Sequence, residues 1–191
     1  DSSTSRGLGD VYKRQEQGRL KEAEASYRQS ILLKPDLAQV HLNLGNVMIK
    51  QGKFEEAEAS YRQAIILNPN LAKAHNNLGI IMKKQGRLEE AEASYRQAIK
   101  LKPDLAEAHN NLGIIMKELG RLEEAFSAFI QAINLNPDFT DAYANFAIAI
   151  KRVRFTSSNV NLYPLLIQII NSGNYMKMEC TSNFRKGKIK V

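Results

Sequence analysis

The sequence predicts an all-α protein assembled from helix–turn–helix units of 34 residues. Three features recur at this step. They are a proline, a glycine and an aromatic residue, found at Pro35, Pro69, Pro103 and Pro137, at Gly18, Gly52, Gly86 and Gly120, and at Tyr27, Tyr61, Tyr95 and Phe129. A fixed step of this length is typical of repeat proteins, in which each unit buries its apolar face against the next unit.

One unit illustrates how the two helices are predicted. In "AKAHNNLGIIMKKQ", Leu78 and Met82 lie on one apolar stripe at helical spacing. Gly86 then supplies a residue that tolerates a left-handed turn. In "RLEEAEASYRQAIKL", Tyr95 lies on the apolar face while the glutamates lie on the other. Pro103 ends this second helix and turns the chain into the next unit.

Six residues of one repeat form a pattern that is known from a protein family. The positions concerned hold Leu78, Gly79, Ala91, Tyr95, Ala98 and Pro103. This skeleton resembles the tetratricopeptide repeat (TPR) family, with repeats similar to those of O-linked GlcNAc transferase-like and marine bacterial TPR proteins. The resemblance covers residues 16–153 and implies a right-handed superhelical solenoid of about four units plus a capping helix.

The repeats depart from the family pattern at two positions. Histidine replaces the usual tryptophan, and methionine stands where tyrosine is common, at His41, His75, His109, Met48, Met82 and Met116. Both replacements keep a bulky packing group, so the fold prediction is unchanged. We expect these histidines and methionines to be core residues.

The segment before the array is out of register with it. Counting back one repeat from Leu44 reaches Asp10, a charged residue where a packing leucine belongs. The stretch "DVYKRQ" is also what one reading frame of a transposase mosaic end would encode. We therefore predict that residues 1–15 are a non-native or disordered leader, and that the first repeat is cut through its middle.

The segment after the array begins with a fifth first helix whose second helix does not follow. Residues 154–174, which include "LLIQII", are predicted to cap the last apolar face. This junction is similar to one in marine bacterial proteins that join TPR arrays to a methyltransferase-type domain. Residues 175–191 are polar, basic and without periodicity, and are predicted to be a disordered tail.

Charge and composition argue against several classes of function. The net charge is +7, but residues 154–191 alone hold six basic residues and one acidic residue, so the basicity belongs to the tail rather than to a nucleic-acid surface. No apolar run approaches the roughly 18 residues of a membrane-spanning helix. The repeated histidines are too far apart to share a metal ion, and Cys180 has no histidine nearby. We expect no cofactor, no metal and no catalysis from this chain, and a cytoplasmic location.

The candidate binding residues are asparagines that recur at the repeat step on the first helices. They are Asn43, Asn77, Asn111 and Asn145. An asparagine side chain offers an acceptor and two donors, which match a peptide amide. The ladder is similar to that of the O-linked GlcNAc transferase superhelix, where it is associated with binding of a peptide backbone. The alternative is that each asparagine only bonds locally in a solvated groove.

Lysines late in the first helices extend the candidate site. Lys50, Lys84 and Lys117 belong to this set, while the second helices carry the glutamates. One interpretation is a basic concave face and an acidic convex face, favouring an acidic peptide. The other is that these lysines complement helix C-termini. The carboxylate clamp for heat-shock chaperones is not expected, because Leu42, Asn76 and Asn110 occupy places where it needs lysine.

The sequence thus predicts a non-catalytic scaffold that binds an extended segment of a partner protein in the concave groove, with no nucleic-acid or membrane partner. The alternative is the substrate-recruiting arm of a larger enzyme, of methyltransferase or glycosyltransferase type, whose catalytic domain is missing. The oligomeric state and the identity of the peptide are not predicted.

Overall fold

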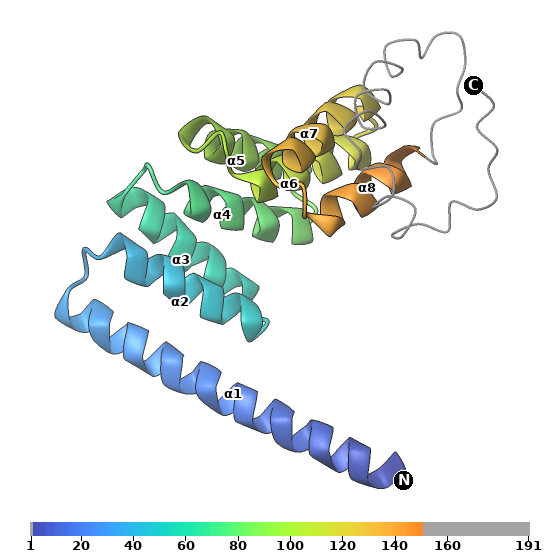
Figure 1. Cartoon of the computed structure of the whole chain (residues 1–191). Coiled ribbons are helices and arrows are strands. Elements are labelled where there is room, and N and C mark those ends of the chain that lie inside the picture. The colour runs from blue at the N-terminus through green and yellow to red at the C-terminus, as the bar shows by residue number, and fades with distance from the viewer. Residues whose placement is uncertain (1, 151–191) are drawn as a thin grey trace, which may run out of the picture. The chain divides into compact units, whose positions relative to one another are not determined.

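The computed structural model describes residues 2–150, with side chains from residue 16, and within that range every element is a helix. The helices are α1 (Ser2–Leu33), α2 (Ala38–Lys50), α3 (Phe54–Leu67), α4 (Ala72–Lys84), α5 (Leu88–Leu101), α6 (Ala106–Glu118), α7 (Leu122–Leu135) and α8 (Thr140–Ile150) (Figure 1). First helices begin 34 residues apart, and so do the second helices α3, α5 and α7. The predicted all-α fold of helix–turn–helix units is confirmed.

The turn between the two helices of each repeat is formed by a glycine in the left-handed region of φ. Gly52, Gly86 and Gly120 have φ of 77°, 76° and 77°. The residue after the glycine closes the turn, because the Lys53 N–H donates to the Met48 carbonyl at 2.9 Å. This 6→1 bond satisfies a carbonyl that the end of a helix would otherwise leave unpaired.

The two helices of one unit pack closely because the first helix has a glycine opposite an aromatic ring. A Cβ added at Gly45 would lie 2.5 Å from Cε1 of Tyr61, and one added at Gly113 would lie 2.6 Å from Cε1 of Phe129. Both rings are fully buried. The Leu-Gly and aromatic positions of the repeat are therefore two halves of one contact.

The histidines that replace tryptophan bond to the turn between units. Nε2 of His41 lies 3.0 Å from the carbonyl oxygen of Pro35, and His109 lies 2.8 Å from that of Pro103. The same contact joins His75 and Pro69. The prediction that these histidines pack at or near the core holds for His41, which is buried, whereas His75 and His109 are half-buried. The spacing did not indicate their hydrogen bonds.

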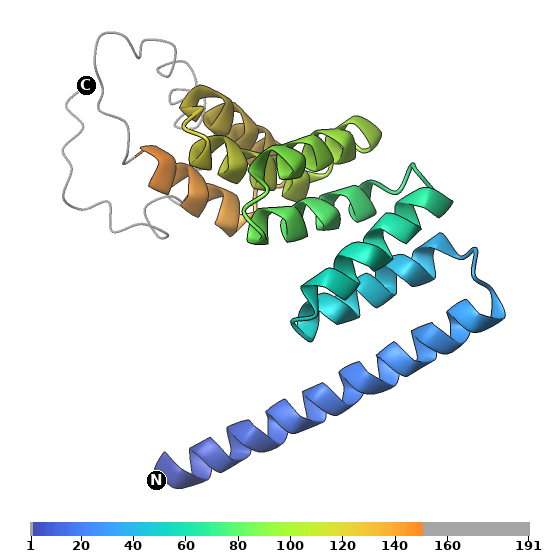
Figure 2. The same cartoon turned by 180° about the vertical axis from the view of Figure 1, so that it is seen from behind.

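The described helices fall into two compact units, which divide between Ile81 and Met82. In the first unit, α2 packs against α1 and α3, and the views from front and back agree on this (Figure 2). In the second unit, α6 packs against α5, α7 and α8. There the rings of Phe126 and Phe146 meet edge to face with centroids 5.4 Å apart.

The start of the chain is the segment that was predicted to be a leader. The backbone of residues 2–15 is helical and continues into the in-register part of α1. Extending an existing helix is favourable because each added residue gains one hydrogen bond without a new nucleus. The assignment of residues 1–15 as a non-native or disordered leader stays a prediction.

The end of the chain was predicted to hold a cap and a tail. Residues 154–174 and 175–191, as well as 151–153 of the array, lie outside the described residues. Within the described range, no helix combines the length and the apolar character that spanning a membrane requires.

Candidate functional site

The ladder asparagines lie at equivalent places on the four first helices. Asn43 is on α2, Asn77 on α4, Asn111 on α6 and Asn145 on α8, and all four are half-buried. Each follows the repeat's histidine or tyrosine by two residues, which turns its side chain about 200° around the helix axis. The asparagines thus leave the stripe that packs on the second helices.

In the first unit, hydrogen bonds between asparagine side chains join α2 to α4. Nδ2 of Asn77 donates to Oδ1 of Asn46 at 2.8 Å, and Nδ2 of Asn76 donates to Oδ1 of Asn77 at 3.2 Å. The hydroxyl of Tyr61 also donates to Oδ1 of Asn46, at 2.8 Å. Asn77 is therefore held in one orientation by contacts on both ends of its amide.

The tyrosine in this network stays protonated at neutral pH. Burial raises the pKa of Tyr61 to about 12, because the phenolate would lose its hydration. Its hydroxyl therefore remains a donor toward Asn46. Asn43 makes a local contact instead, accepting a bond from Nε2 of Gln39 at 3.1 Å.

In the second unit, the corresponding bond joins α6 to α8. Nδ2 of Asn145 donates to Oδ1 of Asn110 at 3.1 Å, and Asn110 is only 6% exposed. Asn110 is the counterpart of Asn76, so both units use the residue before the ladder asparagine as a buried partner.

The hydrogen-bond count leaves room for a ligand. An asparagine side chain has two N–H donors and two carbonyl lone pairs. Within the described residues, Asn77 contacts Asn46 and Tyr61 and accepts one bond from Asn76, while Asn145 donates one bond. A lone pair therefore remains on Asn77, and a donor and an acceptor, the pair that a peptide group requires, remain on Asn145.

The ladder residues were predicted from the sequence, but their partners were missed. Asn46, Asn76 and Asn110 had no assigned role in holding the ladder. The sequence could have drawn attention to Asn46, because it is a polar residue at a repeat position that otherwise holds isoleucine, at Ile80, Ile114 and Ile148. Asn43 bonds within its own helix, as the alternative of local bonding expects, whereas Asn77 and Asn145 bond across helices.

The predicted lysines end the first helices. Lys50 and Lys84 are the exposed last residues of α2 and α4, and Lys117 is half-buried near the end of α6. Lys50 lines a cavity of about 560 Å³ beside Lys21, Lys53 and Glu24. The neighbouring Lys83 pairs with Glu118 at 3.7 Å, which reduces the basic character of this part of the second unit. These positions agree with both interpretations of the lysines, a basic face and dipole complementation.

Two glutamates of the second helices are paired with arginines. In the second unit, Glu92 and Glu124 are each bonded to Arg96 and Arg121, with nitrogen–oxygen distances of 2.7–3.1 Å. This arrangement, which we call the charge ring, links α5 to α7. Its charges balance, so this part of the second-helix face is neutral rather than acidic.

A similar arrangement of three ion pairs joins α1 to α3. Its members are Glu24, Arg28, Lys53 and Glu56. A hydrogen bond from Lys53 lowers the pKa of Glu24 to about 2, against an ordinary 4.5. The contacts recur because three of the four residue types recur at the repeat step and the fourth position, Lys53 here and Arg121 in the second unit, stays positively charged.

Among the side chains that the structure describes, in residues 16–150, no group of three or more histidine, cysteine, aspartate or glutamate residues is placed to hold a metal ion. Each of the three histidines in this range has one ring nitrogen against a proline carbonyl.

Sequence comparison identifies the repeat. The family model of the TPR repeat matches residues 9–52, 45–86 and 81–120, and that of the tetratricopeptide repeat matches residues 106–139. A search of curated proteins finds no match.

Solved structures with the same fold include MamA and YrrB. MamA superposes with a TM-score of 0.69 at 21% identity, over 90% of this chain and 96% of its own. YrrB, described as a TPR protein with an unusual peptide-binding site, gives 0.62 at 21% identity, over 87% and 84% of the two chains. The O-GlcNAc transferase of Thermobaculum terrenum gives 0.57 at 23% identity, covering 59% of this chain and 22% of that enzyme.

Proposed function

Because the chain belongs to the tetratricopeptide repeat family, we propose that it is a protein-interaction scaffold whose asparagine ladder binds an extended peptide segment of a partner. The observation that carries the proposal is the cross-helix hydrogen bonding of Asn77 and Asn145, which orients both amides and leaves an acceptor on Asn77 and a donor and an acceptor on Asn145. These groups match the carbonyl and the N–H of an extended backbone.

The bonded asparagines favour binding because they are already ordered. A free side chain loses rotamer entropy when it contacts a ligand, at a cost of about 0.5–1.5 kcal/mol. Asn77 has lost most of that freedom in the folded protein, since Asn46 and Asn76 hold both ends of its amide. Recognition of the backbone by such groups makes few demands on the partner's side chains.

The partner segment is proposed to carry acidic residues. Lys50, Lys84 and Lys117 end the first helices that hold the asparagines, so a carboxylate beside the bound backbone gains a favourable contact. The charge is partly offset by the pairing of Lys83 with Glu118. We therefore expect a mild preference for acidic segments and a weak dependence on salt. The alternative role, as the recruiting arm of a larger enzyme, would use the same surface and stays a prediction.

The test begins with a library of random peptides displayed on phage and selected on the purified chain. A selected peptide is labelled, and its affinity is measured by fluorescence anisotropy. The double variant Asn77→Ala, Asn111→Ala should weaken binding by about thirtyfold, from the loss of two bonds of about 1 kcal/mol each. Helical circular dichroism should persist.

A matched control has the same change in composition on exposed asparagines away from the ladder. Asn70→Ala with Asn134→Ala alters the turn before α4 and the outer side of α7. This control should bind as the parent does. Equal affinity of the ladder variant and the control, or failure to select any peptide, would contradict the proposal.

A further inference from the structure

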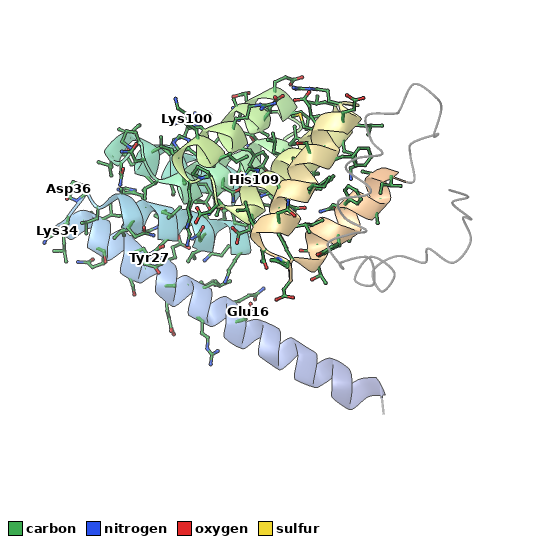
Figure 3. The ribbon with its side chains drawn as sticks, turned by 45° about the horizontal axis from the view of Figure 1, so that its top comes forward. Glu16, Tyr27, Lys34, Asp36, Lys100 and His109 are labelled. Carbon is green, nitrogen blue, oxygen red and sulfur yellow. The ribbon has the colours of Figure 1, made fainter. Side chains whose placement is uncertain are left out.

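A concavity lies on the side of α6 that faces α5 and α7. It is a cavity of about 450 Å³ between α5, α6 and α7. His109, Leu112 and Met116 of α6 line it, and they belong to the stripe that faces the second helices. Figure 3 labels Lys100 on α5 and His109 on α6, the residues that mark its two sides.

The floor of this cavity is apolar. Met116 is fully buried, and Leu112 and Ala128 are each 8% exposed. Ile99 of α5 adds a half-buried aliphatic wall. Ligand-binding cavities span about 300–1,000 Å³ and have mostly apolar linings, so this one has room for an aliphatic side chain and the backbone beside it.

The rim carries one unbalanced positive charge. Arg96 and Glu124 also line the cavity, but they pair with each other at 3.1 Å within the charge ring. Lys100 forms no ion pair with the described residues, and it is exposed. His109 is anchored through Nε2 to the carbonyl of Pro103. The cavity therefore offers an apolar floor with a single cation at its edge.

The other repeats show that this cation is particular to α5. The same repeat position holds Leu32 in α1, Ile66 in α3 and Asn134 in α7. Leu32 and Ile66 are 76% and 71% exposed, so the position faces outward and does not require lysine for folding. At this repeat position, α5 carries a positive charge, whereas α1, α3 and α7 carry uncharged residues.

We propose that this cavity binds an internal leucine–glutamate pair of a partner protein, with the leucine side chain between Ile99 and Leu112, next to the buried Met116, and the carboxylate on Lys100. Charge complementarity selects the carboxylate, because Lys100 is the unbalanced charge of the lining. None of the ladder asparagines lines this cavity, so the site does not depend on the ladder.

The probe is an acetylated and amidated hexapeptide, Gly-Ser-Leu-Glu-Ser-Gly, added to protein whose methionine methyl groups carry carbon-13. The peptide should shift the methyl signal of Met116 and leave that of Met48 unchanged. Peptides with Gln in place of Glu, or with Ala in place of Leu, should bind about threefold or more weakly.

Variants of the protein separate the cavity from other surfaces. Lys100→Leu, which introduces the residue found at position 32, should remove the preference for Glu over Gln. Ser127→Trp should block the cavity from an exposed rim position. The control Lys73→Leu removes an exposed lysine elsewhere, and Asn77→Ala with Asn111→Ala disables the ladder; both should leave the Met116 shift intact.

Three results would overturn the proposal. The first is an unshifted Met116 signal at millimolar peptide. The second is an unchanged preference for Glu in Lys100→Leu. The third is binding only of a peptide with a free terminal carboxylate, which would assign the cavity to chain ends.

Discussion

Replacing Gly45 by alanine tests how the packing of a single repeat supports the candidate site. The added Cβ would lie 2.5, 2.8 and 2.9 Å from three ring carbons of Tyr61, well inside the roughly 3.5–4.0 Å of a favourable carbon–carbon contact. The ring cannot swing aside cheaply, because it is fully buried and its hydroxyl is bonded to Asn46. The helices α2 and α3 must therefore separate.

The expected cost follows from two opposing terms. Overpacking of a well-packed core costs about 1–3 kcal/mol. The better helix propensity of alanine returns about 0.5–1 kcal/mol. We expect the free energy of unfolding to fall by about 1–2 kcal/mol, and Tm to fall by roughly 2–4 °C for each kcal/mol in a chain of this size.

The assay is urea unfolding followed by circular dichroism, and α1 supplies the control. Gly18 also lies inside a helix, but a Cβ there meets nothing within 4 Å. Gly18→Ala should be stabilising by about 0.5–1 kcal/mol from propensity alone. Equal effects of the two substitutions, or stabilisation by Gly45→Ala, would refute the close contact between Gly45 and Tyr61.

Two further predictions concern the polar contacts of the first unit. Asn46→Ile, which introduces the residue of the other repeats, removes the acceptor used by Tyr61 and Asn77. It should lower the free energy of unfolding by about 1–3 kcal/mol, and Tyr61→Phe added to it should recover part of that loss; strictly additive effects in urea unfolding would argue against the shared acceptor. The folded-state pKa of Glu24, about 2, lies below its ordinary value, so its contribution to stability is present above about pH 4.5 and is lost as the pH falls toward 2. The fall in stability over this range should be smaller in Glu24→Gln, and a pH profile identical to the parent's would contradict the pairing with Lys53.

The repeat step predicted the fold closely, because it fixes elements rather than single contacts. The spacing of Gly52, Gly86 and Pro69 sets where helices end, and a positive φ or a missing N–H leaves the backbone little choice there. The contact of Gly45 with Tyr61 recurs as the contact of Gly113 with Phe129. The repeated glycine and aromatic positions in the sequence therefore also indicated how the two helices of a repeat pack.

The site was predicted less completely, for a physical reason. Periodicity gives the face on which Asn77 lies, but its partners depend on the side-chain orientation of Asn46 on another helix. The glutamates suggested an acidic surface because their partners are distant in sequence: Glu92 meets Arg121, 29 residues away. Charges counted along one helix do not include those that the next helix brings beside them.

Backbone methylation of the ligand tests most directly whether the ladder asparagines recognise a peptide backbone. A peptide selected on the chain is synthesised with each backbone nitrogen methylated in turn, which removes one N–H donor and keeps every side chain. We predict that methylation at the residues facing Asn77 and Asn145 weakens binding by about fivefold or more, and that the side-chain amide signals of these asparagines shift when the unmodified peptide binds. Equal affinity across the whole methylated series, with those signals unmoved, would contradict recognition of the backbone by the asparagines.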